Sequence, residues 1–131
     1  MSAVVVTGAG GHVGATLIRS LLADGHTVRA LDKEPGIALE GLPVEIMTGD
    51  IRDPDFLCSA FHNGDQLFHL ASVISTSGDK GGLVPSVNVD GARNVFRFGG
   101  HDHARWTGLI RGIPDGARLE IVLTVGLVVE F

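Results

Sequence analysis

The stretch that decides the fold is Val4-Val5-Val6-Thr7-Gly8-Ala9-Gly10-Gly11-His12-Val13-Gly14. Three consecutive β-branched residues predict a short buried strand, and glycines follow at once. Apolar residues then recur at helical spacing from Val13 to Leu22, which predicts a helix over residues 15–23. A strand, a glycine-rich turn and a helix in this order are the local context in which glycines bind a dinucleotide.

Each of the three spaced glycines has a separate expected role. Gly8 lets the chain turn sharply off the strand, Gly11 lets the backbone approach a pyrophosphate, and Gly14 lets the helix pack closely on the sheet. Free N–H groups and the positive end of the helix dipole then face the phosphates. The alternative is a structural turn that binds nothing, but the complete context favours a phosphate site. We assign to this site Gly8, Gly10, Gly11, His12 and Val13.

Length and composition fit one globular domain over residues 1–131, because 44% of the chain is hydrophobic and 19% is charged. The net charge of -5, without any basic run, argues against nucleic acid as a partner. A single cysteine, Cys58, cannot form an internal disulfide and favours a reducing compartment. No secretion signal is visible and no apolar run reaches the length of a membrane span, so we expect a cytoplasmic protein without a membrane segment.

Alternating strand and helix patterns predict an α/β fold, a Rossmann-type three-layer doubly wound parallel sheet with strand order 3-2-1-4-5. The strands are expected at residues 4–6, 27–31, 44–47, 66–71 and 119–129, and the helices at 15–23, 54–62 and 83–98. Asp32 ends the second strand, where an acid accepts hydrogen bonds from the adenosine ribose and repels a 2′-phosphate. Asp32 therefore favours NAD over NADP, although the Lys33 cation could meet a phosphate; the alternative is a solvated acid in a turn.

Three later segments extend the pattern: Gly49-Asp50-Ile51-Arg52-Asp53, His69-Leu70-Ala71-Ser72 and Val87-Asn88-Val89-Asp90-Gly91-Ala92-Arg93-Asn94. With the glycine turn they resemble the extended short-chain dehydrogenase/reductase superfamily over residues 4–98. That group includes NAD-dependent epimerases, dehydratases and dihydroflavonol-reductase-like enzymes. The loop 77–84 looks most like the dihydroflavonol-reductase-like or 3β-hydroxysteroid-dehydrogenase-like branch.

The resemblance implies roles for single residues. Asp50 would accept from the adenine amino group while Ile51 packs on the ring, and Asn88 would fix the backbone near the active centre. The nicotinamide ribose and the phosphates would lie against Leu70, Ala71 and Ser72. Asp53, followed by Pro54, is instead expected to cap a helix. His69 is expected to be a strand histidine satisfied by hydrogen bonds, since no partner stands at a metal-ligand spacing.

After Phe98 the chain departs from the family. Residues 119–129 take the place of the fifth strand, which in the family ends in Thr-Ser-Ser with a catalytic serine or threonine. Here the corresponding residues are Thr124-Val125-Gly126, so the catalytic hydroxyl is lost unless Thr124 shifts into its position. The chain has no tyrosine, and its lysines are Lys33 and Lys80, so the family's Tyr-x-x-x-Lys is absent and we assign no catalytic residue. His101 and His103 are expected in a solvated loop rather than a metal site.

The expected function is therefore the cofactor-binding part of an NAD(P)-dependent oxidoreductase or epimerase, whose parent chemistry is hydride transfer at a carbinol or ketone carbon. A small-molecule substrate is expected only for a full-length parent. The alternatives are a non-catalytic dinucleotide sensor or interaction module, an inactive truncated product, and a bare structural domain. An apolar edge strand at residues 119–129 also predicts a homo-oligomer.

Overall fold

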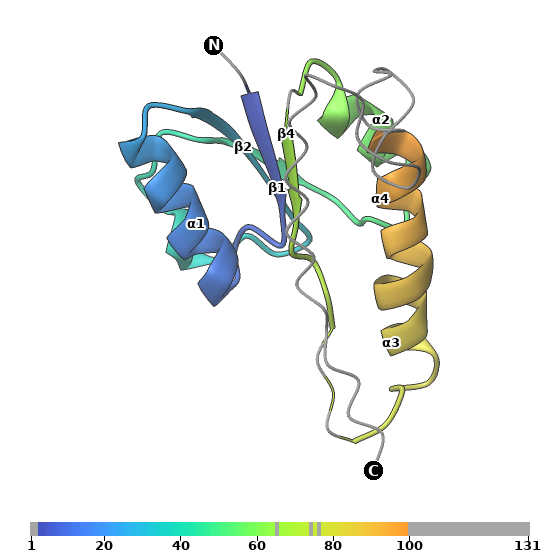
Figure 1. The fold of residues 1–131 in the computed structure, drawn as a ribbon. Helices are drawn as coiled ribbons and strands as arrows, with labels where there is room; N and C mark the ends of the chain where they lie inside the picture. Colours follow the sequence, from blue (N-terminus) through green and yellow to red (C-terminus); the bar gives the residue numbers. More distant parts are fainter. Residues whose placement is uncertain (1–2, 65, 74, 76, 100–131) are drawn as a thin grey trace, which may run out of the picture.

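The computed structural model describes residues 3–64, 66–73, 75 and 77–99, which form three layers (Figure 1). The middle layer is a parallel sheet of β1 (Ala3–Thr7), β2 (Thr27–Asp32), β3 (Glu45–Thr48) and β4 (Gln66–His69) in the order β3-β2-β1-β4. This order confirms the predicted arrangement of the first four strands. The predicted fifth strand lies outside the described residues, as do His101, His103 and Thr124.

Helices cover both faces of the sheet. One face carries α1 (His12–Ala23), and the other carries α2 (Pro54–Phe61), α3 (Leu83–Pro85) and α4 (Ala92–Gly99) (Figure 1). A single 3₁₀ turn, η1 (Ile37–Leu39), follows β2, and a π-helical segment, η2 (Ser86–Gly91), joins α3 to α4. The predicted helix over residues 83–98 is thus one helical stretch of three segments. None of the described helices has the length and apolar character needed to cross a membrane.

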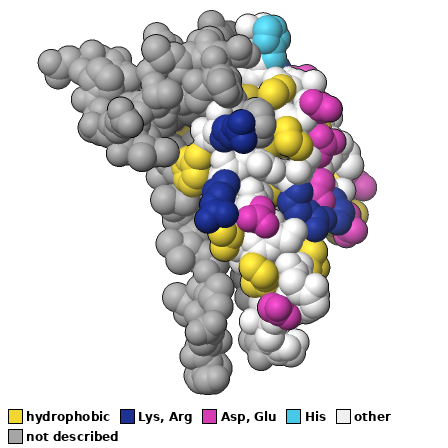
Figure 2. Space-filling view, turned by 90° about the vertical axis from the view of Figure 1, so that its right-hand side faces the viewer, with side chains coloured by type: hydrophobic (Ala, Val, Ile, Leu, Met, Phe, Trp, Pro, Cys, Tyr) yellow, Lys and Arg dark blue, Asp and Glu magenta, His cyan; other side chains and the backbone are white. Residues whose placement is uncertain are grey.

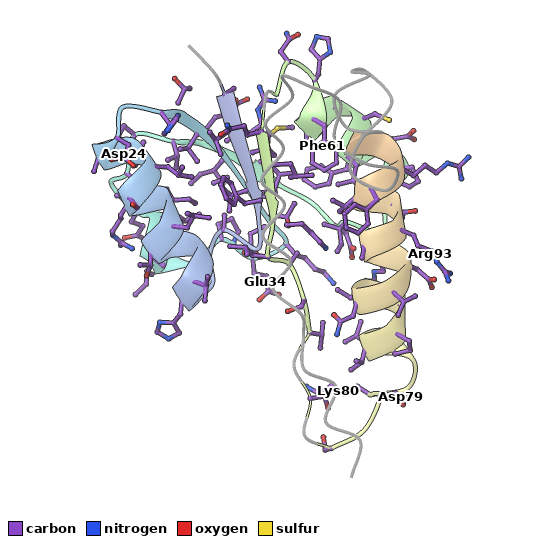
Figure 3. The ribbon with its side chains drawn as sticks, in the orientation of Figure 1. Asp24, Glu34, Phe61, Asp79, Lys80 and Arg93 are labelled. Atoms are coloured by element: carbon purple, nitrogen blue, oxygen red, sulfur yellow. The ribbon has the colours of Figure 1, made fainter. Side chains whose placement is uncertain are left out.

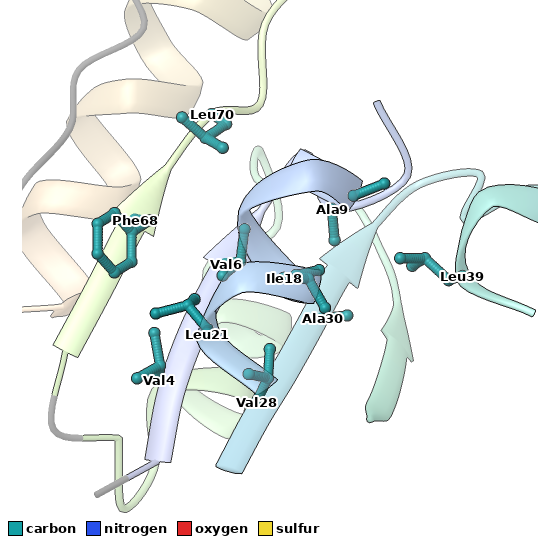
Figure 4. Close-up of a cluster of buried hydrophobic side chains, with 11 residues drawn as sticks. Val4, Val6, Ala9, Ile18, Leu21, Val28, Ala30, Leu39, Phe68 and Leu70 are labelled. Carbon is teal, nitrogen blue, oxygen red and sulfur yellow. The ribbon is translucent and has the colours of Figure 1, made fainter. Parts of the chain in front are cut away.

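The position of β1 in the middle of the sheet explains why no polar residue interrupts its three valines. β1 is hydrogen-bonded to β2 on one side and β4 on the other, with Val5 opposite both Arg29 and Leu67. Val4 and Val6 point into the cluster beneath α1, which Figure 4 shows with Ile18 and Leu21. Val5 points the other way, into a cluster that includes Leu57, Phe61 and Val95; Phe61 is labelled in Figure 3. Because both faces of the sheet are covered, β1 is apolar from Ala3 to Val6.

The ends of the helices follow from local chemistry. Gly11, with φ -75° and ψ 171°, is the N-cap of α1, so the helix begins at His12, before the apolar periodicity starts. Asp53 caps α2 as predicted, because its Oδ1 accepts from the backbone N–H of Asp55 at 3.0 Å and of Phe56 at 3.4 Å. Pro54 occupies the first turn, where a missing N–H costs nothing.

The outer face formed by α2, α3 and α4 carries charges of both signs. Figure 2 shows lysine and arginine side chains interspersed with aspartate and glutamate rather than gathered into a basic patch. Arg93 and Asp90, for example, form an exposed ion pair of 3.5 Å on this side of the molecule.

Candidate functional site

A cleft of about 470 Å³ lies where β1, β2, β3 and β4 end at their carboxyl termini. In a doubly wound sheet this edge is where ligands bind, at the point where the connections from neighbouring strands diverge to opposite faces. Ten of the residues assigned from the sequence line the cleft: Gly8, Gly11, His12, Val13, Asp32, Asp50, Ile51, Leu70, Ala71 and Ser72. The fold therefore brings four separate sequence segments to one place.

The two remaining assigned residues stand behind the cleft wall. The Gly10 N–H donates to Asp32 Oδ2 at 2.8 Å and so joins the glycine turn to the end of β2. The Asn88 side chain accepts from the Val73 N–H at 2.8 Å and donates to the Val73 carbonyl at 2.9 Å. Val73 itself lines the cleft, so Asn88 fixes a piece of backbone there, as the resemblance implied.

The glycines of the turn differ in what their missing side chains make room for. Gly8 has φ +68°, and a Cβ on it would lie 2.6 Å from the Ala71 nitrogen, so packing within the chain requires glycine there. A Cβ on Gly14 would overlap the backbone of Gly8 and Ala9. The nearest described atom to a Cβ on Gly11 is the Gly8 carbonyl oxygen, 3.4 Å away. The described residues leave the space beside Gly11 open, and that space belongs to the cleft.

The amino end of α1 faces the same cleft. Its first helical hydrogen bond joins the Ala15 N–H to the Gly11 carbonyl at 2.9 Å, so the N–H groups of His12, Val13 and Gly14 have no partner within the helix. The first turn of α1 holds no acidic residue to neutralise the positive end of its dipole. These groups are chemically suited to an anion such as a phosphate.

Thr7 joins the ends of β1 and β4 below the cleft. Its buried Oγ1 accepts from the N–H groups of Leu70 at 3.1 Å and Ala71 at 3.2 Å, and lies 2.7 Å from His69 Nδ1. With both lone pairs used, the hydroxyl donates to His69, whose ring is then neutral with its proton on Nε2. Burial lowers the pKa of His69 to about 4, in agreement with the neutral ring. His69 is thus satisfied by a hydrogen bond, as predicted.

Two carboxylates line the cleft beyond β2 and β3. Asp32 accepts from the Gly10 N–H through Oδ2 and from the Glu34 N–H through Oδ1 at 3.0 Å. Figure 3 labels Glu34 just past the carboxyl end of β2. Each carboxylate oxygen has a second lone pair, so Asp32 can still accept hydrogen bonds from hydroxyl groups of a ligand.

Asp50 is bound by a cation that the sequence analysis did not assign to the site. Arg52 Nη2 lies 2.7 Å from Asp50 Oδ2, and Arg52 Nε lies 3.0 Å from Oδ1. Lys33 Nζ lies 3.7 Å from the same Oδ2. The hydrogen bonds from Arg52 hold the pKa of Asp50 at about 2. The available sequence signal was an arginine two residues after an acid that closely follows a strand.

Apolar side chains that the sequence analysis did not assign complete the cleft wall. They include Phe56, Leu83 and Val87. The Phe56 ring packs where a Cβ on Gly49 would stand, 2.5 Å from Cδ2, which explains the glycine before Asp50. Gly91 similarly leaves room for the Ile51 side chain, whose Cδ1 would lie 2.6 Å from a Cβ on Gly91. Within the described residues, no group of three potential ligands could hold a metal ion.

Comparisons with known proteins agree with this geometry. The model of the 3-beta hydroxysteroid dehydrogenase/isomerase family matches residues 5–101. A 3 beta-hydroxysteroid dehydrogenase/Delta 5-->4-isomerase of Mycobacterium tuberculosis is 36% identical over 104 residues, 73% of this chain and 28% of that protein. Sterol demethylase protein B of Methylococcus capsulatus is 44% identical over 96 residues, 71% of this chain and 29% of that protein.

Among solved structures, a short-chain dehydrogenase/reductase superfamily protein from Agrobacterium tumefaciens with bound NAD is similar, with a TM-score of 0.62 and 27% identity. The match covers 74% of this chain and 30% of that one. The chain thus spans less than a third of the length of these relatives. With the family model matching most of the sequence, this chain belongs to the 3-beta hydroxysteroid dehydrogenase/isomerase family.

Proposed function

We propose that the cleft binds NAD. The observation that carries this proposal is the open space beside Gly11, where the amino end of α1, Asp32 and the Leu70–Ser72 segment meet without any atom of the described residues filling the gap. The pyrophosphate would be held by the glycine turn and the first N–H groups of α1. The NAD bound to the similar Agrobacterium protein supports the same ligand.

The remaining assignments follow the cleft outward from the pyrophosphate. Asp32 would accept from the adenosine ribose, and Asp50 and Ile51 would contact the adenine. On the other side, Leu70, Ala71 and Ser72 would meet the nicotinamide half, with Asn88 holding the backbone behind them. Asp32 would also repel a 2′-phosphate, which favours NAD over NADP.

The test is calorimetric binding of NAD and NADP to the 131-residue chain and to Asp32→Ala. We expect NAD to bind the variant about tenfold more weakly, because a charged acceptor is lost. We also expect the preference for NAD over NADP to shrink, because the repulsion of the 2′-phosphate is lost too. A turn that was merely disturbed would weaken both ligands equally.

The matched control is Asp24→Ala, because Asp24 caps the far end of α1, away from the cleft (Figure 3). We expect this variant to bind NAD like the unchanged chain. If neither NAD nor NADP binds the unchanged chain, the result contradicts the proposal and favours a structural domain.

For a chain of the relatives' full length we propose oxidoreductase chemistry at a carbinol or ketone carbon, as the names of the curated relatives suggest. When bound, NAD supplies the hydride acceptor, and the residues of this chain bind and orient it. The absence of tyrosine from the 131 residues favours a second candidate, a dinucleotide-binding module without turnover. Formation of reduced nicotinamide from a panel of secondary alcohols would favour the first candidate, and binding without turnover the second.

We also propose self-association and a cytoplasmic location. Self-association through residues 119–129 is supported by their apolar composition, and a clean monomer in light scattering at high concentration would contradict it. A cytoplasmic location is supported by Cys58, a free and exposed thiol.

A further inference from the structure

At the end of the cleft where we propose that adenine binds, several hydrogen bonds fix the Asp50 carboxylate. Besides its side-chain hydrogen bonds through Nε and Nη2, Arg52 donates its own backbone N–H to Asp50 Oδ1 at 2.9 Å. The carboxylate is therefore held along one edge by three donors from a single residue. A carboxylate fixed in this way can turn only its remaining lone pairs toward a ligand.

Arg52 is itself fixed from the other side. Its Nη1 donates to Ser86 Oγ at 3.1 Å, and its backbone carbonyl accepts from Asn94 Nδ2 at 3.2 Å. Ser86 begins the π-helical segment η2 and Asn94 lies in α4, so both contacts join Arg52 to the same helical stretch. The guanidinium is thus held between the cleft and the helices and does not swing freely in solvent.

From this arrangement we infer that Arg52 is a positioning residue that makes the cleft selective for a 6-aminopurine over a 6-oxopurine. The inference rests on the proposed binding of NAD. The ionised Asp50 carboxylate presents acceptors only, and the contacts from Arg52 fix where those acceptors lie. An adenine amino group can donate to such a carboxylate, whereas the carbonyl of hypoxanthine at the same position is repelled. The low pKa of Asp50, about 2, means that the carboxylate does not take up a proton and become a donor at neutral pH.

The probe is nicotinamide hypoxanthine dinucleotide, which differs from NAD by a carbonyl in place of the adenine amino group. We expect the unchanged chain to bind NAD about tenfold more tightly than this analogue, the usual worth of a hydrogen bond to a charged group. In Arg52→Met the preference should fall below about threefold, because Asp50 is no longer held in one orientation. Asp50→Asn should abolish the preference, since an amide can turn either an acceptor or a donor toward the purine.

The matched control is Arg93→Met. Arg93 also pairs with a nearby aspartate, Asp90, but on the exposed outer face, and it does not line the cleft. The preference of Arg93→Met for NAD over the hypoxanthine analogue should equal that of the unchanged chain. Ser86→Ala serves as a milder variant in case Arg52→Met does not fold, because it removes only the outer contact of the guanidinium. We expect Ser86→Ala to reduce the preference about twofold to threefold.

The outcomes separate the two proposals. Binding of neither dinucleotide by the unchanged chain contradicts the proposed function. Equal binding of NAD and the hypoxanthine analogue leaves the proposed function standing and overturns this inference. The inference is also overturned if folded Arg52→Met, or Ser86→Ala in its place, keeps the full preference for adenine.

Discussion

A single hydroxyl group, that of Thr7, fastens the carboxyl ends of β1 and β4. It accepts two backbone N–H groups and donates to His69, which is almost fully buried. The arrangement depends on a neutral imidazole, because a proton on Nδ1 would face the hydroxyl hydrogen. Stability should therefore respond to pH at this residue.

The pKa of His69 is about 4 in the folded chain, against an ordinary value of 6.5. Between these values the unfolded chain binds a proton that the folded chain excludes, so the free energy of unfolding falls as pH drops from 6.5 to 4. From pH 7 to pH 5 we expect this residue to contribute a loss of about 2 kcal/mol, measured by urea denaturation.

His69→Asn is the control for this prediction, since its side-chain oxygen can accept from Thr7 without titrating. The variant should lose correspondingly less stability between pH 7 and pH 5. Equal losses in both chains would contradict the prediction. Asp50 does not interfere, because the lowered pKa of its carboxyl places its own contribution below pH 4, where acid weakens the folded state.

Alanine substitutions at Gly8 and Gly41 separate the stability cost of steric overlap from that of a strained backbone. Gly8 and Gly41 have similar positive φ angles, +68° and +74°, but a Cβ has no described neighbour within 4 Å at Gly41. Gly41→Ala should cost about 1–2 kcal/mol of stability from the left-handed conformation alone. Gly8→Ala should cost roughly twice that or more, because the methyl group also meets the Leu70–Ala71 backbone. Equal losses in urea denaturation would mean that the turn relaxes freely.

Some residues of the cleft could be predicted from the sequence and others could not. The glycine turn and Asp32 could be assigned because a local pattern fixes their place at strand ends. Arg52 could not, since its contact with Ser86 joins residues 34 positions apart and depends on how the helices pack. Phe56 could not be assigned either, because helical periodicity does not say that its ring ends against Gly49.

The helical stretch from α3 to α4 is hydrogen-bonded to backbone groups on both sides of the cleft. Asn88 holds the Val73 backbone on one side, and Asn94 donates to the Ile51 carbonyl at 3.3 Å on the other. Asn88 itself lies in the π-helical segment η2, a form often found at functional sites, and Asn94 lies in α4. The helical periodicity predicted this stretch but not its wider turn, because a single inserted residue barely changes the apolar spacing.

The substitution Asn88→Ala tests the hydrogen bonds between Asn88 and the Val73 backbone. The Val73 N–H should lose its acceptor and exchange its hydrogen much faster, which can be followed by nuclear magnetic resonance. Asn88→Asp keeps an acceptor oxygen and should retain much of the protection, whereas Asn94→Ala should leave Val73 protected. Unchanged exchange at Val73 in Asn88→Ala would contradict the role given to this side chain.

The first four strands and the three helical stretches were predicted at the right places because their hydrophobic periods are strong, and the boundaries shifted for physical reasons. β4 ends at His69 rather than Ala71, because from Leu70 onward the backbone binds the Thr7 hydroxyl and carbonyl. The parallel order β3-β2-β1-β4 was expected from the resemblance and the alternation of elements. Which side chains meet across the two helical layers required the structure.

At the scale of the whole molecule, ligand binding and folding are coupled. A dinucleotide that binds only the folded chain raises the free energy of unfolding by about 2.7 kcal/mol at a hundredfold excess over its dissociation constant. We expect NAD to raise the thermal midpoint of the unchanged chain and of Asp24→Ala, but to raise that of Asp32→Ala only about half as much at the same concentration, because its binding is about tenfold weaker. Equal shifts in all three chains would place the ligand elsewhere.

The hydrogen bond between the Gly10 N–H and Asp32 has a kinetic consequence. It gives the glycine turn its shape before any ligand arrives, so no loop has to fold during the encounter. In a stopped-flow experiment, association should then be a single step whose observed rate rises in proportion to the dinucleotide concentration. A plateau at high concentration would instead reveal a slow rearrangement of the turn.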